Sequence, residues 1–228
     1  MTELAIFDLD RTLTIRPTYS AFLIYAARHL SPWRLGLLPL LAPHAAGYAM
    51  KRIPRRRMKE AMHAMALGKR VGRHKVEAVA DSFAEKLVEN GIFPQAQSLF
   101  AKERQAGRRI VLATAAPALY VEPLAHRLKI DDVIATRNSW HGDVLLSDIS
   151  EDNCYAACKQ HRIAEWLEEQ GIARNNARIT FYSDHASDLP TFEWVDEPVA
   201  VNPSKALATI ARARGWRVLD WRAEMARA

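Results

Sequence analysis

Two aspartates stand directly after the first apolar run of the chain. Residues 4–7, Leu-Ala-Ile-Phe, form a short run that is typical of a strand buried on both faces. Asp8 and Asp10 follow it, and because they are one strand period apart they leave the strand towards the same side. Carboxylates so close repel each other unless a cation or a proton lies between them. A ligand site at this strand end is therefore one interpretation, and a solvated, Asp-rich turn is the other.

The composition is that of a globular protein. The 228 residues are 49% hydrophobic and 25% charged, which is enough apolar material for a sizeable core and does not indicate disorder. Asp8 and Asp10 interrupt the N-terminal apolar segment, so we expect no signal peptide. The two cysteines, Cys154 and Cys158, are too few for a disulfide framework. A reducing cytoplasm is therefore the expected location.

The positive charge of the chain is concentrated in one segment. Residues 15–93 contain 14 Lys and Arg against 5 Asp and Glu, whereas the other residues contain 18 against 21. The formal net charge of +6 therefore comes from this one segment. We expect it to meet something anionic.

From residue 95 onwards the pattern alternates between helices and buried strands. The expected strands are residues 109–113, 132–136, 178–182 and 198–201, with an edge strand at 217–219. The expected helices are residues 97–105, 118–128, 154–170 and 204–214. A hairpin is predicted to turn at residues 141–143, His-Gly-Asp. Repeated strand–helix units predict an α/β fold with a doubly wound parallel sheet covered by helices on both faces.

The segment between the first and second strands is helical instead. Residues 21–30 are strongly apolar and end at a Ser-Pro break. Residues 58–90 have the pattern of two amphipathic helices that stop at Gly91. We therefore expect residues 15–93 to be a helical domain inserted into a core that is made of residues 1–14 and 94–228.

The longest apolar run, residues 35–50, has two interpretations. It is shorter than the roughly 20 residues that span a bilayer, and it contains prolines. The first interpretation is a pair of helices buried inside the helical domain. The second is a surface that dips into a lipid interface, with Trp33, Arg34 and the arginines at 55–57 at the level of the headgroups.

Polar side chains follow other predicted strands as well. Asp184 and Asp188 come after one of them, and Thr114 comes directly after another. Because the carboxyl ends of parallel strands share one edge of the sheet, we expect these side chains to converge with the two N-terminal aspartates. Thr114 is also expected at the start of the next helix, where free backbone N–H groups, that of Ala115 included, favour an anion. Lys159, in a preceding helix, would add a positive charge.

These groups suit phosphoryl transfer. A hard cation with oxygen ligands, for which Mg²⁺ is the expected choice, would neutralise the acids and bind phosphate oxygens. The lysine and the helix N–H groups would balance the remaining phosphoryl charge. One carboxylate can attack phosphorus, and a second can protonate the leaving oxygen.

The same residues resemble the four sequence motifs of the haloacid dehalogenase (HAD) superfamily of phosphohydrolases. The motifs are residues 8–14 (DLDRTLT), Thr114 after a buried strand, Lys159, and residues 183–188 (SDHASD). The helical insertion between the first two motifs is similar to that of the phosphoserine phosphatase-like, helical-cap branch (subfamily IB). The resemblance implies a Rossmann-like core with an inserted α-helical cap. It also implies Mg²⁺-dependent hydrolysis of a phosphomonoester.

The resemblance gives each catalytic residue a role. Asp8 would be the nucleophile that forms an aspartyl-phosphate. Asp10 would be the acid that protonates the leaving group and then the base that activates water. Thr114, Ala115 and Lys159 would bind the transferring phosphoryl group, with Lys159 also paired to Asp8.

The resemblance also implies a metal site. Mg²⁺ would be held by Asp8, the backbone carbonyl of Asp10 and Asp184. Asp188 would support it through water or as a further ligand. The alternative for Asp188 is that its side chain caps the short helix expected at residues 189–192, and both roles can hold together.

Two departures from the family pattern bear on the substrate. Arg11 stands where the superfamily commonly has glycine, and it either reaches the phosphate rim or points to solvent. Phosphoserine phosphatases typically place an acid shortly after the first motif to hold the substrate ammonium. This chain has no acidic residue between Asp10 and Glu60, which argues against phosphoserine itself.

The helical segment instead offers Arg16, Arg28 and Arg34 beside the apolar run. Such a surface suits an anionic substrate with an apolar body and is similar, at a coarse level, to the cap of phosphatidylglycerophosphate phosphatases of this branch. A small soluble phosphomonoester is the leading prediction. A lipid-headgroup phosphate, hydrolysed by a protein peripheral to the inner face of an anionic membrane, is the alternative.

A third alternative belongs to another class: a catalytically idle protein that docks on a membrane or on nucleic acid. An idle protein has no reason to keep the aspartates and the lysine together. The basic segment also lacks the interleaved aromatic residues of a stacking platform, so we expect no nucleic-acid partner.

Overall fold

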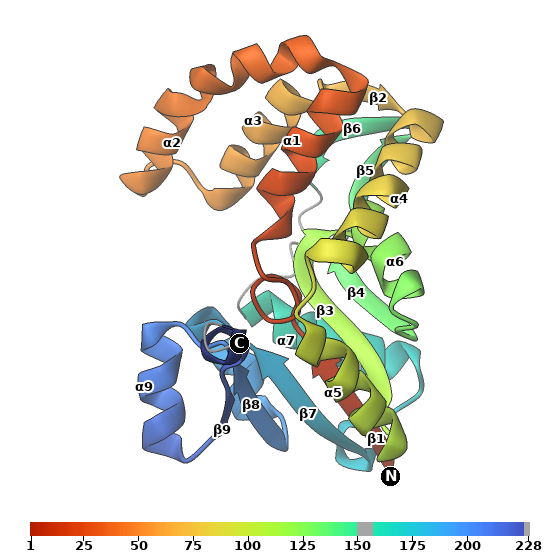
Figure 1. Ribbon diagram of the computed structural model, residues 1–228, viewed down its shortest axis with the longest axis vertical. Coiled ribbons are helices and arrows are strands. Elements are labelled where there is room, and N and C mark those ends of the chain that lie inside the picture. The colour runs from red at the N-terminus through yellow and green to blue at the C-terminus, as the bar shows by residue number, and fades with distance from the viewer. Residues whose placement is uncertain (150–156, 226–228) are drawn as a thin grey trace.

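The core is a parallel sheet (Figure 1). In residues 1–149 and 157–225, which the computed structural model of the protein describes, six strands run in the order β4-β3-β1-β7-β8-β9 with every neighbouring pair parallel. The strands are β1 (Thr2–Phe7), β3 (Arg109–Pro117), β4 (Asp132–Thr136), β7 (Ala177–Ser183), β8 (Glu197–Val201) and β9 (Arg217–Leu219). The predicted parallel sheet, including its edge strand, is confirmed.

The first strand lies in the middle of this sheet, with a parallel neighbour on each side. Phe7, the last residue of β1, is paired with Leu112 of β3 on one side and with Tyr182 of β7 on the other. Asp8 continues the ladder by one bond, since its backbone N–H donates to the Tyr182 carbonyl at 2.9 Å. Asp8 therefore emerges at the carboxyl edge, between β7, which ends at Ser183, and β3, whose register shifts after Ala113.

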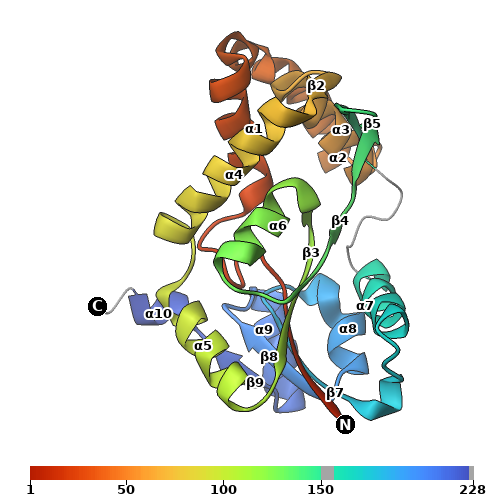
Figure 2. The same cartoon turned by 90° about the vertical axis from the view of Figure 1, so that its right-hand side faces the viewer.

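Helices cover both faces of the sheet, as predicted, with α5 and α7 on opposite sides (Figure 2). On one face Phe7 packs edge-on against Phe100 of α5, with ring centroids 5.0 Å apart. On the other face Ile6 lies in a separate core with Phe181 and Phe192. Successive residues of β1 thus enter different cores, as alternation along a doubly covered strand requires. The helices of this part are α5 (Pro94–Gln105), α6 (Ala118–Arg127), α7 (Ala157–Glu169), α8 (Leu189–Trp194), α9 (Lys205–Arg214) and α10 (Trp221–Met225), with short 3₁₀ turns η2 (Arg174–Asn176) and η3 (Ala186–Asp188).

A second group of helices stands beyond the carboxyl edge of the sheet (Figure 1). It consists of α1 (Thr18–Leu30), the 3₁₀ helix η1 (Pro32–Leu41), α2 (Ala42–Ala49), α3 (Arg55–Ala66) and α4 (Arg73–Asn90). The chain enters and leaves this group side by side. The Ile15 N–H donates to the Gly91 carbonyl and the Phe93 N–H to the Leu13 carbonyl, both at 2.9 Å. We propose on this basis that residues 15–93 are the cap domain and that residues 1–14 and 94–228 are the core domain.

A hairpin from the core reaches the cap (Figure 2). Its strands, β5 (Asn138–His141) and β6 (Val144–Ile149), flank the predicted turn and confirm it. β6 also pairs antiparallel with β2 (Arg70–Gly72) of the cap, a strand that the sequence did not indicate. The Arg73 guanidinium lies over the Trp140 ring, 3.9 Å from its centroid. Cap and core are therefore joined at a second place, away from the two linking segments.

The apolar run of residues 35–50 is not buried. In η1 no residue is buried, and in α2 only Gly47 is. Pro39 lies inside η1, where it cannot donate a backbone hydrogen bond. Leu35 and Leu38 pack against the core cluster with partial burial, so one side of the segment serves the fold and the other is left uncovered. The interpretation as a buried helix pair is wrong, whereas the lipid interpretation stays a prediction.

The remaining elements differ little from the prediction. α9 follows Ser204, whose hydroxyl accepts the Leu207 N–H, and ends at Gly215 with φ +66°. The first residues of the helix predicted at 154–170, Cys154 among them, lie outside the described residues. Cys158 is a free, exposed thiol. Among the described helices, none combines the length and the apolar character needed to cross a bilayer.

Candidate active site

The carboxyl edge of the sheet carries a cavity of about 270 Å³. All seven residues that the sequence predicted for the core site line it: Asp8, Asp10, Thr114, Ala115, Lys159, Asp184 and Asp188. Arg11, Pro17, His185 and Ser187 complete the wall. The strand ends therefore bring together groups that are up to 180 positions apart in the sequence.

Lys159 is held between two carboxylates. Its Nζ lies 2.7 Å from Asp8 Oδ1 and 2.7 Å from Asp188 Oδ2, and all three side chains are buried. The Ser183 hydroxyl donates to the same Asp188 oxygen at 2.6 Å. The Thr12 hydroxyl donates to the other oxygen of Asp8 at 3.2 Å. The lysine and the two hydroxyls thereby fix the positions of both carboxylates.

Asp188 does not cap the helix that follows it. α8 begins at Leu189, but the Asp188 side chain makes no capping hydrogen bond. Its carboxylate instead turns inward to Lys159 and Ser183. The alternative in which the side chain caps this helix is therefore wrong.

The cavity holds more negative charge than its own residues balance. Burial, as the largest cause, raises the pKa of Asp8 to about 6, the negative charge of Asp188 adds to this, and Lys159 opposes it. Burial likewise raises the pKa of Asp184 to about 7, with further contributions from the charges of Asp8 and Asp188. Each carboxylate would ionise at a lower pH if a cation lay beside it.

This imbalance fits a divalent cation. Asp184 is buried, and the described residues give its carboxylate no hydrogen bond that would satisfy it. The described residues contain no group of three His, Cys, Asp or Glu side chains arranged around one point. The expected Mg²⁺ ligands include only two such side chains, Asp8 and Asp184, because the third ligand is the backbone carbonyl of Asp10. The expected site would therefore not form such a group. Oxygen donors of this kind suit Mg²⁺, which keeps several of its waters.

Asp10 is turned towards the cap. One of its carboxylate oxygens accepts both the backbone N–H of Thr18, at 2.8 Å, and the Thr18 hydroxyl, at 2.7 Å. The Thr18 hydroxyl is in turn 2.9 Å from the hydroxyl of Tyr120, which is fully buried. Thr18 is the first residue of α1, so the second aspartate of the motif is held by the cap helix and not by the core alone.

The structure corrects the environment expected for Thr114. β3 continues to Pro117 and α6 begins only at Ala118, so Thr114 is not at a helix N-terminus. The Thr114 hydroxyl accepts the Ala116 N–H at 3.1 Å. A shift in strand register between Ala113 and Pro117 explains the error, because the bulged strand extends past the point where a helix was expected.

The three arginines predicted for substrate contact do not line the cavity. Arg16 and Arg28 are exposed on the described surface, while the Arg34 guanidinium donates to the Ala64 carbonyl at 3.2 Å. Arg11 lines the cavity instead and lies near enough to Asp184 to oppose the rise in its pKa. Arg11 has a φ of +63°, the left-handed conformation that favours glycine.

The comparisons with known proteins agree with this geometry. The family model of haloacid dehalogenase-like hydrolases matches residues 5–193. The chain is 32% identical to the inhibition of morphological differentiation protein of Streptomyces azureus, over 95% of this chain and 78% of that protein. The chain belongs to the HAD family of hydrolases.

Two further proteins are similar to this HAD hydrolase over most of its length. It is 28% identical to phosphoserine phosphatase SerB1 of Mycobacterium tuberculosis, over 97% of this chain and 72% of that protein. A crystal structure of a protein of unknown function from Bordetella pertussis Tohama I superposes with a TM-score of 0.84 at 26% identity, covering 97% of this chain and 99% of that one. The resemblance seen in the sequence is therefore confirmed, and so is the HAD fold.

Sequence reasoning missed one basic residue beside the site of this HAD hydrolase. Lys59 of α3 is buried, and its Nζ donates to the Ala115 carbonyl at 3.0 Å. The Thr136 hydroxyl donates to the same carbonyl at 3.0 Å. In the sequence Lys59 belongs to the basic stretch of the cap, where every residue looks like a solvated charge. Its burial follows from the docking of α3 onto the core, which the sequence does not reveal.

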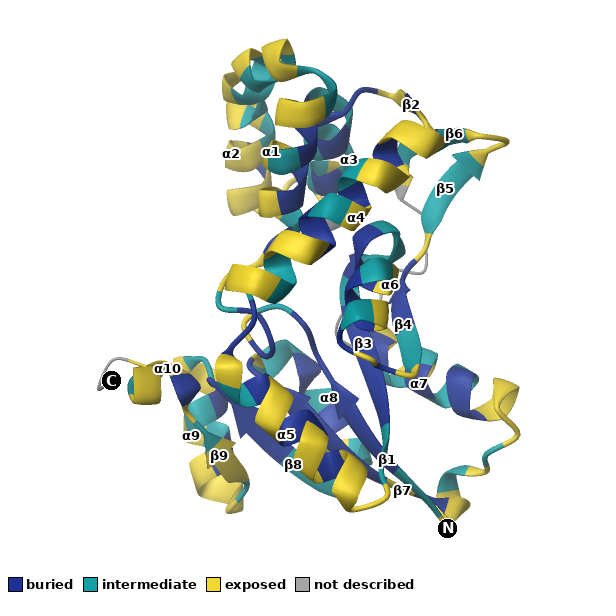
Figure 3. Cartoon of the chain, turned by 45° about the vertical axis from the view of Figure 1, so that its right-hand side comes forward, coloured by how far each residue is buried: buried dark blue, intermediate teal, exposed yellow. Residues whose placement is uncertain are grey.

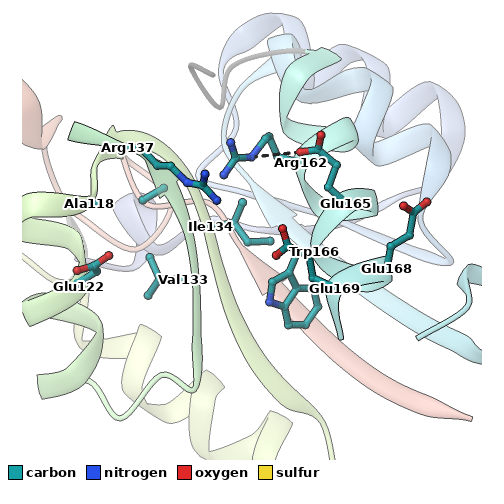
Figure 4. Close-up of a pocket in the computed structure, with 11 residues that line it drawn as sticks. Ala118, Glu122, Val133, Ile134, Arg137, Arg162, Glu165, Trp166, Glu168 and Glu169 are labelled. Carbon is teal, nitrogen blue, oxygen red and sulfur yellow. Dashed lines mark ion pairs between the residues drawn. The ribbon is translucent and has the colours of Figure 1, made fainter. Parts of the chain in front are cut away.

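A larger cavity, of about 540 Å³, lies away from the aspartates, between α6, β4 and α7 (Figure 4). Glutamates of α6 and α7 and two arginines, Arg137 and Arg162, line it, and Arg162 pairs with Glu165 at 3.5 Å. None of the seven predicted core site residues reaches it. Its described lining contains no lysine and so lacks the carboxylate–lysine pair of the carboxyl edge.

Proposed function

We propose that this HAD hydrolase removes phosphate from a phosphomonoester through a covalent aspartyl-phosphate on Asp8, with Mg²⁺ as its cofactor. The observation that carries the proposal is the arrangement of a buried carboxylate, Asp8, against a buried lysine, Lys159, in a cavity with three more aspartates. Such a site combines a nucleophile, a phosphate-binding cation and a candidate acid.

In the first step a carboxylate oxygen of Asp8 attacks phosphorus. The bond between phosphorus and the ester oxygen breaks, and Asp10 gives its proton to the departing oxygen. Lys159 and Thr114 bind the phosphoryl oxygens, because both side chains face the cavity beside Asp8. Thr12 keeps the nucleophile oriented through its hydrogen bond to the second carboxylate oxygen.

In the second step water attacks the phosphorus of the aspartyl-phosphate. Asp10, now ionised, accepts a proton from this water, and the bond between phosphorus and Asp8 breaks to release phosphate. Thr18 holds the Asp10 carboxylate in position in both steps through two hydrogen bonds to one oxygen.

The Mg²⁺ would be held by Asp8, the backbone carbonyl of Asp10 and Asp184. Asp188, whose carboxylate binds Lys159, would support these ligands. When bound, the cation supplies positive charge against the transferring phosphoryl group. Asp8 and Asp184 would then both be ionised at neutral pH, since the burial that raises their pKa values would be offset by a neighbouring charge.

A small phosphomonoester is the proposed substrate class. One relative is named a phosphoserine phosphatase and another a histidinol-phosphatase, which favours a small leaving group. Arg11 at the cavity and the absence of acidic residues between Asp10 and Glu60 favour a leaving group that is neutral or anionic. Among the described residues that line the cavity, a lone ammonium, as in phosphoserine, would find no carboxylate outside the four aspartates.

A phosphomonoester carried by a lipid is the second candidate substrate. The observation that favours it is the exposed apolar run of the cap, which a substrate dissolved in water does not need. Hydrolysis of phosphatidylglycerophosphate in mixed micelles would support it.

Phosphate release tests the proposed function. We would incubate the protein with Mg²⁺ and with phosphoserine, histidinol phosphate, sugar phosphates, glycerol phosphate or phosphatidylglycerophosphate. Asp8→Asn should abolish release, whereas Asp143→Asn, at the exposed hairpin turn, should leave it unchanged. Removal of Mg²⁺ with EDTA should also abolish phosphate release by the unaltered protein. Full release by Asp8→Asn would contradict the proposal.

A further inference from the structure

The outermost segment of the cap exposes large apolar side chains. Trp33 and Leu40 of η1 are 65% and 60% exposed, and Tyr48 and Met50, in and just after α2, are 45% and 56% exposed. Figure 3 shows α2 mostly in the colour of exposed residues. We call these four side chains the apolar cap face. They come from one stretch of 18 residues, whereas exposed large apolar side chains elsewhere in the described chain are scattered.

The fold itself does not need the apolar cap face. Leu35 and Leu38, on the same 3₁₀ helix, already pack against the core cluster. The Arg34 guanidinium lies over the Trp33 ring at 4.7 Å and donates to the Ala64 carbonyl of α3, so it fixes the start of η1. The segment is thus anchored on its inner side, and its outer side lies free of cap contacts that would bury it.

Positive charge flanks the apolar cap face. Lys51, Arg52, Arg56 and Arg57 follow it directly and are exposed, and we call them the basic rim. Arg56 and Arg57 both reach Glu60, at 2.8 and 3.9 Å, so one carboxylate is shared by two guanidinium groups. Since no acidic residue occurs between Asp10 and Glu60, the rim keeps an excess of positive charge.

We propose that the apolar cap face and the basic rim together dock the protein on an anionic lipid bilayer. Trp and Tyr favour the interface between lipid and water, and Leu and Met would enter the acyl boundary beside them. The basic rim would meet the anionic headgroups. A second copy of the chain is a poorer occupant, because a symmetric contact would bring two basic rims together.

The docking surface is separate from the candidate active site. None of its eight side chains lines the cavity at the carboxyl edge. The proposal therefore does not rest on the proposed function, and variants of the surface should release phosphate from soluble esters at the unaltered rate. Failure of docking and failure of catalysis are distinguishable for this reason.

Co-sedimentation with vesicles tests the docking surface. One set of vesicles contains phosphatidylcholine with phosphatidylglycerol, and the other contains phosphatidylcholine alone. We expect the unaltered protein to bind the first set at low salt and to lose binding as salt screens the rim. The double variants Leu40→Ser with Met50→Ser and Arg52→Glu with Arg57→Glu should each lower the partition coefficient about tenfold or more.

Matched controls lie on the core. Val218→Ser removes an exposed apolar side chain that is 47% accessible, and Arg212→Glu reverses an exposed charge on α9. Both should bind vesicles like the unaltered protein. Circular dichroism would establish that all variants are folded. Brominated lipid should quench the fluorescence of the unaltered protein more than that of Trp33→Phe, if the tryptophan enters the interface.

Three results would overturn the proposal. The first is no binding to anionic vesicles at low salt, and the second is binding that the cap variants retain in full. The third is a dimer in light scattering that Leu40→Ser with Met50→Ser converts to a monomer without any vesicle binding, which would assign the surface to a second copy of the chain. Salt-sensitive binding that only the cap variants lose would support it.

Discussion

Thr18 donates two hydrogen bonds to a single carboxylate oxygen of Asp10, one from its backbone N–H and one from its hydroxyl. Asp10 belongs to the loop after β1, and Thr18 is the first residue of the first cap helix. The candidate acid therefore takes its position from the cap. Any movement of α1 relative to the core would have to stretch or break these bonds.

Removing the Thr18 hydroxyl should slow both chemical steps. Thr18→Val keeps the backbone N–H but loses the 2.7 Å bond to Asp10. Hydrogen bonds to charged groups contribute about 1.5–3 kcal/mol, so kcat should fall about tenfold or more with a smaller change in KM. Thr18→Ser keeps the hydroxyl and should retain most of the activity. Steady-state kinetics with a soluble ester would measure both, and equal kcat values for the two variants would refute a positioning role.

The buried carboxylate of Asp184 should lower the free energy of unfolding when no cation is bound. Its pKa is raised to about 7 from 3.8, so the folded state binds more protons than the unfolded state between these values. Stability is therefore lost as pH rises through this window, and the full penalty is present above it. Asp184→Asn should raise the unfolding temperature at about pH 8 in EDTA by several degrees, since each kcal/mol is worth about 2–4 °C at this size.

The unaltered protein and Asp184→Asn also test the metal site. Mg²⁺ should raise the unfolding temperature of the unaltered protein, because a ligand that binds only the folded state stabilises it. Asp184→Asn should lose most of this increase, while Asp143→Asn should keep it. An undiminished response of Asp184→Asn to Mg²⁺ would remove Asp184 from the metal site. Calorimetry in EDTA and in Mg²⁺ gives both measurements.

Much of the candidate site follows from the sequence because of one property of parallel sheets. Their carboxyl ends meet at one edge, so polar residues that follow buried strands converge wherever the strands are placed correctly. Asp8 and Asp184 satisfy this condition, since β1 and β7 are neighbours and end level with each other. Lys159 follows because its helix packs against the same edge. The order of strands did not have to be known.

The sequence failed where tertiary contacts decide the outcome. β2 has three residues, too few for a periodic pattern, and it exists because β6 offers it a partner. Lys59 is buried because α3 docks on the core, although its neighbours in the sequence are solvated. Leu40 is exposed because the segment has only one side against the cap, and apolar character alone does not tell which side is covered.

His63 should make the cap sensitive to acid. It is buried in α3, and the described residues give its Nε2 no hydrogen-bond partner. Burial, as the largest cause, lowers the pKa of His63 to about 4 against the opposing effect of Asp148. In the unfolded state the pKa of a histidine is about 6.5, so as pH falls the unfolded state binds the extra proton before the folded state does. Stability is therefore intact above about pH 6.5 and is lost as pH falls towards 4.

His63→Leu should remove this sensitivity. The loss predicted for the unaltered protein between about pH 7.5 and pH 5 is about 2 kcal/mol. His74→Leu, at an exposed position of α4, is the control and should leave the loss unchanged. Urea unfolding at the two pH values measures the difference. A pH dependence that His63→Leu shares in full with the unaltered protein would show that the histidine is not its cause.

Lys159 should stabilise the fold most strongly at high pH. Its Nζ lies 2.7 Å from a carboxylate oxygen of Asp8 and 2.7 Å from one of Asp188, so two buried carboxylates share this positive charge. Lys159→Met would leave two buried carboxylates without their shared cation, a change that typically costs about 3–5 kcal/mol. The cost should shrink as pH falls, because protonation removes the uncompensated charge and the pKa of Asp8 is already raised to about 6.

Urea unfolding of Lys159→Met at about pH 8 and pH 5.5 would measure this difference. Lys205→Met, at an exposed lysine of α9, should change stability little at either pH. Mg²⁺ should restore part of the lost stability at pH 8, since a divalent cation beside Asp8 would replace some of the missing charge. If Lys159→Met were equally destabilised at both pH values, the lysine would act through packing and not through its charge on the carboxylates.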